Sequence, residues 1–362
     1  MITLLQITIY FILNMRNRAE IRHSEELLTS PQEIFTTLIK ELQRARESID
    51  MEFYIFLGDR IGNTIATLLG RKARQGVRVR LVVDGYGSRK MPRKLRQRLS
   101  SNGIQLRVVH TFSHCRNHRK MVIIDKRIAL VGGINIADRY VVGNELGVWY
   151  DAVLRIAGGS VTELSRLFDF DFTPHTKHST LSPDSSAHSP MLYWSESGGG
   201  GAMLRLLYDI IDGAEREITL TTPYFMPPRG VLEHLQRAIE RGVRISVIIP
   251  RRCDIWLIDD VMRHSIREAE SLGIEVFILD NAFIHAKLAL VDSHRVVVGS
   301  ANLDAHSLTV NRELMLSSRN RTTCASAKQF LHELQQMATL AHDNEIKCHL
   351  PRFITRAIKP LM

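Results

Sequence analysis

The stretch His118–Asp125 reads HRKMVIID, and the stretch His285–Asp292 reads HAKLALVD. Both fit the pattern HxKxxxxD, which a random chain of this composition would contain roughly 0.02 times. Similar Gly-containing turns follow the two stretches, GGIN ending at Asn135 and GSAN ending at Asn302. Two matches with the same downstream context indicate a unit that occurs twice in the chain.

The duplication extends over most of the sequence. The interval between the two motif histidines equals the interval between the two asparagines. Upstream, SIDMEFYIF (48–56) corresponds to EITLTTPYF (217–225), and Gly76 and Gly242 are separated by nearly the same interval. Near-constant offsets at three separated landmarks indicate one unit of about 145 residues written twice.

Each copy alternates helical and strand-like segments. In the first copy, apolar spacing predicts a helix over Ile61–Gln75, stopped by Gly76, and a buried strand over Val79–Val83. The second copy gives a helix over Gly230–Arg241, a strand over Ile245–Ile249 and a helix over Val261–Leu272. This alternation predicts an α/β fold with helices on both faces of each sheet, and two such units around a pseudo-twofold axis.

A polar segment over residues 173–200 separates the two copies. It is rich in Ser, Pro, His and Gly, which break regular structure and cannot build a core. We therefore expect five parts. These are an apolar and basic N-terminal segment over 1–26, domain 1 over 27–172, the linker over 173–200, domain 2 over 201–345 and a basic, apolar tail over 346–362.

The composition is that of a globular protein with a basic surface. Hydrophobic residues make up 44% and charged residues 24%, which excludes wholesale disorder and fibrous classes. Four cysteines without a CxxC pair exclude a disulfide-stapled scaffold, make a zinc knuckle unexpected and favour free thiols. Lys and Arg number 48 against 38 Asp and Glu, and 37 of the 48 are Arg. Because guanidinium groups bind phosphate bidentately, the net charge of +10 indicates nucleic acid or an anionic membrane as partner.

The two ends of the chain raise the question of membrane contact. Residues 1–14, MITLLQITIYFILN, are mostly apolar and precede three arginines. A spanning helix needs about 20 such residues, and a signal peptide needs a basic leader and a small-residue cleavage site. An interfacial anchor, the stub of a longer membrane segment and a core element remain open, and we favour the anchor. Residues 351–362, PRFITRAIKPLM, fit an interfacial contact or a packed tail equally.

The HxK spacing places a histidine and a lysine on the same face of an extended strand. An imidazole beside an ammonium suits a phosphate, since one can attack phosphorus while the other holds a nonbridging oxygen. The following Gly-containing turn and its asparagine would bring further donors to those oxygens. Two such pairs across a pseudo-twofold axis place one imidazole on each side of a phosphate, as nucleophile and general acid of an in-line displacement. The sequence is symmetric as to which histidine attacks.

With these motifs, the sequence resembles the phospholipase D superfamily, whose mark is two HxKxxxxD motifs in one chain, and within it the bacterial cardiolipin synthases. The resemblance covers about residues 30–345 apart from the linker. The segments that carry the closer match are Arg74–Arg80 with VDGYGS (83–88), Trp149–Asp151, TTPYFMP (221–227), GSANLDAHSL (299–308) and Asn311–Glu313. Many cardiolipin synthases carry two spanning helices at the N-terminus, where this chain has its short apolar run. A shorter peripheral subgroup is consistent with that departure.

The resemblance implies phospholipase D-like α/β/α sandwich domains and a role for each motif residue. His118 would attack phosphorus to give a phosphohistidine, while His285 would protonate the departing alkoxide and then deprotonate the incoming hydroxyl. Asp151, downstream of the first motif, and Glu313, downstream of the second, would orient the imidazoles. The remaining motif residues, Lys120, Asp125, Lys287 and Asp292, would also belong to the catalytic site. We expect the two motif aspartates to brace strand ends. The groups expected to bind the substrate phosphate beside the lysines are Gly133, Asn135, Ser300 and Asn302. No metal or other cofactor is implied.

The function predicted on these grounds is a phosphatidyltransferase that moves a phosphatidyl group from one phospholipid to the hydroxyl of another. The expected lipid is phosphatidylglycerol, and the expected place is the cytoplasmic face of the cell membrane, with peripheral or weakly anchored attachment. The alternative is a phosphodiesterase of phospholipase D or nuclease type, which would use water as acceptor. A nuclease is disfavoured because the sequence contains no basic run interleaved with aromatics that would stack bases. A binding protein without activity would be expected to have lost a motif histidine or lysine.

Overall fold

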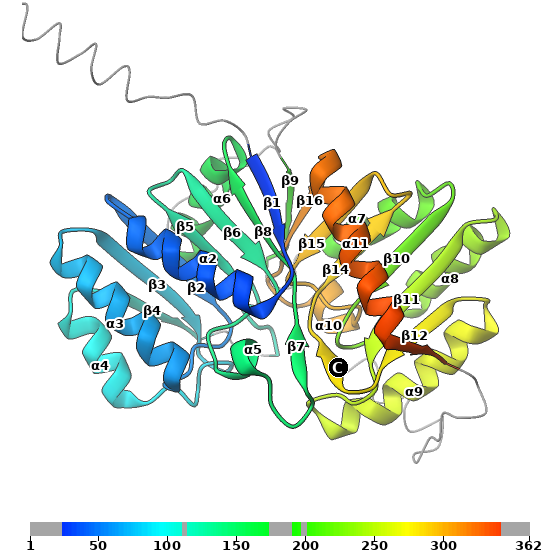
Figure 1. Cartoon of the computed structure of the whole chain (residues 1–362), viewed down its shortest axis with the longest axis horizontal. Helices are drawn as coiled ribbons and strands as arrows, with labels where there is room; N and C mark the ends of the chain where they lie inside the picture. Colours follow the sequence, from blue (N-terminus) through cyan, green and yellow to red (C-terminus); the bar gives the residue numbers. More distant parts are fainter. Residues whose placement is uncertain (1–23, 111–113, 174–189, 197–200, 342–362) are drawn as a thin grey trace, which may run out of the picture.

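The computed structural model describes residues 24–110, 114–173, 190–196 and 201–341, which form two α/β domains side by side (Figure 1). Domain 1 contains strands β1 (Ser24–Leu28), β2 (Ser48–Phe53), β3 (Arg78–Asp84), β4 (Gln105–Val109), β5 (Met121–Ile124), β6 (Ile128–Gly132), β7 (Val148–Tyr150) and β8 (Val153–Ala157). Its helices are α2 (Pro31–Arg44), α3 (Arg60–Arg74), α4 (Arg93–Ser101), α5 (Arg139–Val142) and α6 (Ser160–Phe172).

Domain 2 repeats most of this order of elements. Its strands are β9 (Met191–Trp194), β10 (Glu217–Thr221), β11 (Arg244–Pro250), β12 (Glu275–Leu279), β13 (Ala282–Ile284), β14 (Leu288–Val291), β15 (Arg295–Gly299), β16 (Leu314–Ser318) and β17 (Ala338–Leu340). Its helices are α7 (Ala202–Asp212), α8 (Arg229–Glu240), α9 (Trp256–Ser271), α10 (Ala305–Thr309) and α11 (Arg321–Met337). The order differs from that of domain 1 in that β13 precedes the motif strand β14, no strand corresponds to β7, and β17 is added at the end. The apolar N-terminal run, most of the predicted linker and the predicted C-terminal tail lie outside the described residues.

Each domain is built on one mixed sheet. The strand order is β1-β8-β6-β5-β2-β3-β4 in domain 1 and β17-β12-β11-β10-β14-β15-β16-β9 in domain 2. In both sheets three neighbouring strands are parallel, β2-β3-β4 and β10-β11-β12, and a helix forms each crossover between them. The other neighbours pair antiparallel. The structure thus confirms the predicted duplicated α/β fold.

The helices form three layers around the two sheets. Helix α2 begins after Ser30, whose side chain accepts a hydrogen bond from the Glu33 N–H, with Pro31 in the first turn. The apolar stripes of α2, α3 and α4 bury the outer face of the domain 1 sheet, and those of α7, α8 and α9 bury the outer face of the domain 2 sheet. Helices α6 and α11 share one core with the inner faces of both sheets. This shared core fixes the two domains against each other.

The predicted helices and strands are confirmed, with ends shifted by one to five residues. The helix expected over Ile61–Gln75 is α3, and the strand after it is β3. The three elements predicted in the second copy are α8, β11 and α9, of which α9 starts five residues earlier than expected. Gly76 and Gly273 follow α3 and α9 with φ of +88° and +89°, a conformation that favours glycine after a helix.

Strand β9 corrects the predicted linker. It pairs with β16 at the edge of the domain 2 sheet, and Leu192 enters the shared core. It is the counterpart of β1, which pairs with β8 at the matching edge of the domain 1 sheet, and Met191 follows Ser24 by the same interval that separates the two motif histidines. Both edge strands therefore begin before the predicted starts of their domains, β1 before residue 27 and β9 before residue 201. The polarity of the surrounding segment hid β9, because four residues are too few to show a period.

Candidate active site

The two HxKxxxxD motifs occupy equivalent places in the two sheets. His118 and Lys120 lie just before β5, and His285 and Lys287 lie just before β14. β5 pairs with β2 and β6, and β14 pairs with β10 and β15, so each motif leads into a central strand. Both histidines line one cleft of about 510 Å³ whose walls come from the two domains. The structure therefore brings the two motifs into one site.

The two motif aspartates lie at the far ends of these strands. Asp125 begins the β5–β6 turn with φ of +52°, and Asp292 begins the β14–β15 turn with φ of +50°. The Asp125 carboxylate accepts from the backbone N–H groups of residues 46–48 at 2.7–3.1 Å. The Asp292 carboxylate accepts from those of residues 215–217 at 2.7–2.9 Å. Both brace strand ends, as expected, and neither lines the cleft, which corrects their place in the catalytic set.

Each imidazole is oriented by a carboxylate from the other domain. His118 Nδ1 lies 2.9 Å from Glu313 Oε1, and His285 Nδ1 lies 2.7 Å from Asp151 Oδ2. The two predicted carboxylates both reach a histidine, but the sequence order pairs each with the motif of its own copy, and the structure exchanges them. Because an ionised carboxylate only accepts hydrogen bonds, Nδ1 carries the proton in each ring and Nε2 is left for chemistry.

Backbone hydrogen bonds across the domain boundary produce this exchange. The His285 N–H donates to the Tyr150 carbonyl at 2.7 Å, next to the point where β13 runs parallel to β7. On the other side, the His118 N–H donates to the Arg312 carbonyl at 2.9 Å, and the Arg312 N–H donates to the Arg116 carbonyl at 2.9 Å. Tyr150 and Arg312 each precede an orienting carboxylate by one residue. The pairing therefore delivers each carboxylate to the opposite histidine.

Ser300 and Gly133, predicted to bind the substrate, support the carboxylates instead. Ser300 Oγ donates to Glu313 Oε2 at 2.5 Å and accepts from the Leu314 N–H at 2.9 Å. At the equivalent position in domain 1, a Cβ on Gly133 would lie 2.2 Å from Asp151 Oδ1, so only glycine leaves room for that carboxylate. Both residues thus act on the orienting groups, which corrects the prediction that they meet the phosphate.

The two asparagines differ in how far their amides are engaged. Asn135 Oδ1 accepts from the Ile55 N–H at 2.9 Å, and its Nδ2 donates to the Tyr140 hydroxyl at 2.7 Å. Asn302 also lines the cleft, and its buried Oδ1 has no hydrogen-bond partner among the described residues. Asn302 therefore offers a ligand an unused acceptor oxygen, which suits a hydroxyl rather than a phosphate oxygen, whereas Asn135 holds the domain 1 wall in place.

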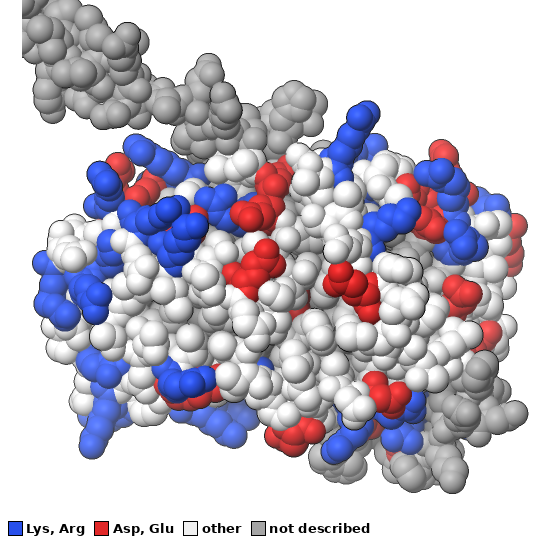
Figure 2. All heavy atoms as spheres, viewed as in Figure 1, with Lys and Arg blue, Asp and Glu red and all other residues white. Residues whose placement is uncertain are grey.

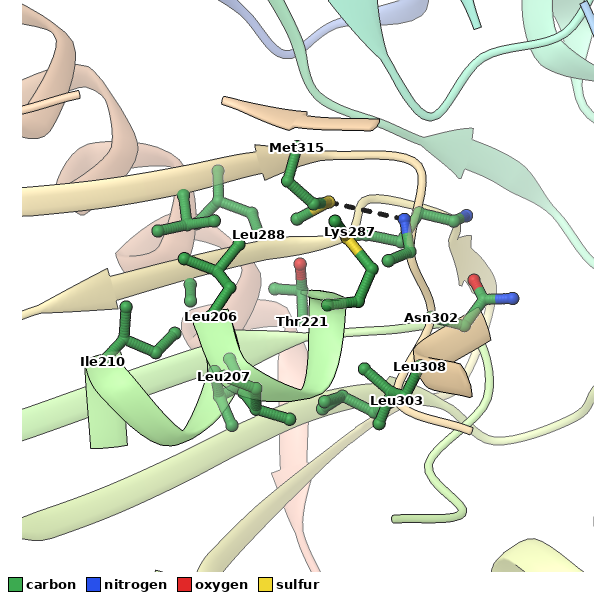
Figure 3. A pocket seen from close by; sticks show the side chains of 15 residues that line it. Leu206, Leu207, Ile210, Thr221, Lys287, Leu288, Asn302, Leu303, Leu308 and Met315 are labelled. Carbon is green, nitrogen blue, oxygen red and sulfur yellow. Dashed lines mark hydrogen bonds between the residues drawn. The ribbon is translucent and has the colours of Figure 1, made fainter. Parts of the chain in front are cut away.

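Both motif lysines are buried against their own histidines. Lys120 Nζ donates to the His118 carbonyl at 2.5 Å, and Lys287 Nζ donates to the His285 carbonyl. Burial lowers the pKa of Lys120 well below its usual value and that of Lys287 to about 8. Figure 3 shows the Lys287 stem beside an apolar cavity of about 50 Å³. Its other labelled lining side chains include Leu206, Leu207, Ile210, Leu303, Leu308 and Met315.

Burial also lowers the pKa of both imidazoles. It lowers the pKa of His118 against the opposing charge of Glu313, and it lowers the pKa of His285 further, with help from Lys287 and Lys120. The partner carboxylates respond differently. Burial raises the pKa of Asp151 to about 6, whereas for Glu313 the effect of burial is outweighed by His118 and the pKa is lowered.

Aromatic rings that the sequence reasoning missed pack against both histidines. The Tyr54 ring lies edge-on to His118 at 5.0 Å, and the Tyr140 ring lies edge-on to His285 at 5.1 Å. Tyr54 lies within SIDMEFYIF directly after β2, so its position at the end of that strand was the available signal. Tyr140 lies on the four-residue helix α5, and nothing in the two motifs indicates that this helix reaches the site. Both rings restrict the imidazoles to one orientation.

The sequence matches a family model described as cardiolipin synthase, PLD-like domain, once over residues 38–169 and again over residues 207–338. A cardiolipin synthase of Halalkalibacterium halodurans is 29% identical over 346 residues, which cover 89% of this chain and 67% of that protein. The major cardiolipin synthase of Bacillus subtilis is 30% identical over 331 residues, covering 84% of this chain and 67% of that protein. The chain thus spans about two thirds of the length of these relatives.

Among solved structures, the fold is similar to that of phosphatidylserine synthase from Haemophilus influenzae. The TM-score is 0.72 at 15% sequence identity, and the match covers 92% of each chain. The agreement over both chains shows that the two-domain arrangement occurs as a whole in another protein.

Proposed function

This chain belongs to the cardiolipin synthase family of phospholipase D-like proteins, and we propose that it is a phosphatidyltransferase that joins two phospholipids. The observation that carries the proposal is the pair of imidazoles in one cleft, each oriented through Nδ1 by a carboxylate of the other domain. Such a pair provides two Nε2 atoms for one phosphodiester. One attacks phosphorus, and the other manages the proton of the alcohol that leaves or enters.

The first half-reaction transfers the phosphatidyl group to the protein. His118 Nε2 attacks phosphorus and forms a P–N bond, while the bond from phosphorus to the head-group oxygen breaks. His285 enters this step as the imidazolium and passes its Nε2 proton to that oxygen, so the head group leaves as a neutral alcohol and His285 becomes neutral. We assign His118 as nucleophile from the family resemblance, because the two sides share the same hydrogen-bond pattern.

The second half-reaction passes the group to the acceptor. The acceptor hydroxyl gives its proton to His285 Nε2 and its oxygen bonds to phosphorus, while the P–N bond breaks and returns His118 to its neutral form. Asp151 stabilises the imidazolium form of His285, which is present before the first step and is restored by the second. Lys120 and Lys287 lie behind the imidazoles and offset the negative charge on the nonbridging oxygens.

The charge distribution supports an anionic phospholipid surface as partner, with phosphatidylglycerol as substrate and the cytoplasmic face of the membrane as location. Residues 24–173 contain 24 Lys and Arg against 16 Asp and Glu, whereas residues 190–341 contain 16 against 18. Figure 2 shows the basic side chains gathered over domain 1, at the left, and mixed with acidic ones over domain 2. No helix in the described ranges combines the length and apolar character that crossing a bilayer requires. Peripheral attachment through charge fits these observations.

The test is to incubate the purified chain with phosphatidylglycerol vesicles and to measure cardiolipin and glycerol by mass spectrometry. We expect both products from the wild type, none from His118→Asn, and unchanged yields from His332→Asn, a histidine on the exposed face of α11. Phosphatidic acid as the main product would instead assign water as acceptor. Equal turnover by His118→Asn and wild type would rule out the proposed chemistry altogether.

A further inference from the structure

Two arginine side chains meet at one tyrosine ring on the domain 1 side of the cleft. The Arg89 guanidinium carbon lies 4.3 Å from the centroid of the Tyr86 ring, and that of Arg116 lies 4.2 Å from it. All three residues line the cleft that holds His118, and Tyr86 is 52% exposed. Aromatic faces attract guanidinium groups, so the ring gathers two positive charges at one point of the rim.

Asp84 fixes the backbone beneath these side chains. One of its carboxylate oxygens accepts from the N–H groups of Tyr86 and Gly87 at 2.9 and 2.8 Å, and the other accepts from the Asn117 N–H at 2.9 Å. The turn that carries Arg89 and the segment that carries Arg116 are therefore tied to the same buried group. The cluster is preorganised, and the charge of Asp84 is directed to backbone donors.

The two guanidinium groups also donate to nearby backbone carbonyls. Arg89 Nη1 donates to the Tyr86 carbonyl at 2.9 Å, and Arg116 Nη1 donates to the Cys115 carbonyl at 2.9 Å. Like charges held close together repel, which an incoming anion would relieve. Phe283 precedes His285 by two residues, as Arg116 precedes His118, so the domain 2 motif has no arginine at the position of Arg116. The asymmetry indicates a task that belongs to one side of the cleft.

The turn that carries Tyr86 packs against Tyr54, the residue whose ring contacts the nucleophile. Tyr54 packs edge-on against His118 at 5.0 Å, and a Cβ on Gly87 would lie 2.3 Å from the Tyr54 carbonyl oxygen, so the turn of Tyr86 rests on Tyr54. Arg116 precedes His118 by two residues. An anion held by the guanidinium groups thus lies in the same cleft as the phosphate that reacts, on a different set of side chains.

We propose that Arg89 and Arg116 form a second phosphate subsite, which binds the phosphodiester of the acceptor phospholipid. The inference rests on the proposed function, in which two phospholipids meet in one cleft. The free glycerol hydroxyl of the acceptor attacks phosphorus of the phosphohistidine, its proton passes to His285, and the P–N bond to His118 breaks. The second phosphate stays intact and serves as the handle, because a guanidinium fork matches its two nonbridging oxygens.

The experiment compares three acceptors with one phosphatidyl donor. The first is phosphatidylglycerol, the second is glycerophosphoglycerol, which has the same phosphodiester without acyl chains, and the third is 1-butanol, which has no phosphate. In Arg89→Gln/Arg116→Gln we expect transfer to the first two acceptors to fall about tenfold or more through a raised KM. Transfer to 1-butanol should stay within about twofold of wild type, since no subsite contact is lost.

The matched control is Arg93→Gln/Lys94→Gln, which removes the same charge from the exposed face of α4 outside the cleft. It should leave all three transfers unchanged. Parallel losses with all acceptors, or equal losses in the control, would overturn the subsite. A loss confined to phosphatidylglycerol would assign the pair to membrane docking and would overturn it too. Thermal unfolding checks that the double variant folds, and the single variant Arg89→Gln, at an exposed position, repeats the comparison if it does not. If the wild type transfers the phosphatidyl group only to water, that result contradicts the proposed transferase function, and is thereby distinguished from a failure of the subsite alone.

Discussion

His118 and His285 occupy equivalent positions in two copies of one fold, yet the groups around them differ. His118 relies on a glutamate that a serine hydroxyl holds at 2.5 Å, whereas His285 relies on a shorter aspartate that fits only because Gly133 has no side chain. The glutamate has a lowered pKa, and the aspartate has a pKa raised to about 6. The motif strands are alike in the two copies, whereas the carboxylates that orient the histidines and the residues that hold those carboxylates differ. Two chemical roles can therefore arise from one repeated motif.

The largest expected effect separates the histidines themselves. His118→Asn should abolish turnover and the covalent intermediate, because the attacking nitrogen is gone. His285→Asn should slow turnover by about 10²–10⁴-fold, the usual contribution of a general acid and base, while still forming the adduct. Intact-protein mass spectrometry of an acid-quenched reaction with the phospholipid donor measures the adduct. An adduct on His118→Asn and none on His285→Asn would interchange the two roles.

The next effect concerns the exchanged carboxylates. Glu313→Gln and Asp151→Asn should each lower kcat by about 10²-fold, because the imidazoles lose their orienting charge. If the partners are exchanged as the structure shows, Asp151→Asn adds nothing to His285→Asn, whereas Glu313→Gln lowers the rate of His285→Asn further. Single-turnover rates of the three single and the two double variants check this. A Glu313→Gln change that adds nothing to His285→Asn, with an added loss from Asp151→Asn, would contradict the exchange.

The pH dependence should arise mainly from Asp151 and Lys287, the two groups beside His285. Below about pH 6 Asp151 becomes protonated and no longer stabilises the His285 imidazolium, so kcat falls as the pH drops. Above about pH 8 Lys287 loses its proton and its charge, so kcat falls as the pH rises. Asp151→Asn should remove the acid limb, and Lys287→Arg, for which the adjacent cavity gives some room, should remove the basic limb. Glu313→Gln should retain both limbs, and a profile without them would contradict the asymmetry.

The smallest effect on catalysis is expected at the motif aspartates. Asp125→Asn and Asp292→Asn should leave kcat of the folded protein within about threefold, but lower the free energy of unfolding by about 2 kcal/mol through weakened backbone hydrogen bonds. For Asp292, burial would raise the pKa, but its three N–H donors outweigh that and lower it. Its stabilisation is therefore present above the usual carboxyl pKa and is lost as the pH falls through the lowered value. Urea unfolding at several pH values measures this, and a large loss of kcat in either variant would restore the aspartates to the chemistry.

The repeated fold and the two motifs could be predicted because they depend on local patterns. Helix α3 shows an apolar stripe and a terminal glycine in its own residues, and β5 and β14 show themselves as apolar runs after HxK. The exchange of Asp151 and Glu313 could not be predicted in this way. Each carboxylate follows a motif at a similar distance along the chain, and only the backbone pairing at Tyr150 and Arg312 decides which histidine it meets.

Other parts of the site depended on contacts for which the sequence has no period. Ser300 and Gly133 lie in the turns that were expected to meet phosphate, and the length of the neighbouring carboxylate decides that they support it instead. Strand β9 exists because the edge of the domain 2 sheet needs the partner that β1 provides in domain 1. The constant interval between the two copies was the signal that could have placed it.

The exchange of carboxylates also links activity to the order of synthesis. His118 leaves the ribosome 195 residues before Glu313, which orients it. At about 5–20 residues per second this interval lasts about 10–40 s. Throughout that time the finished first half has His118 and Lys120 but lacks the carboxylate that orients His118. The nascent chain is therefore inactive. A protein that cuts and rejoins lipids thus gains its working parts only when the last strands of its second half have been made.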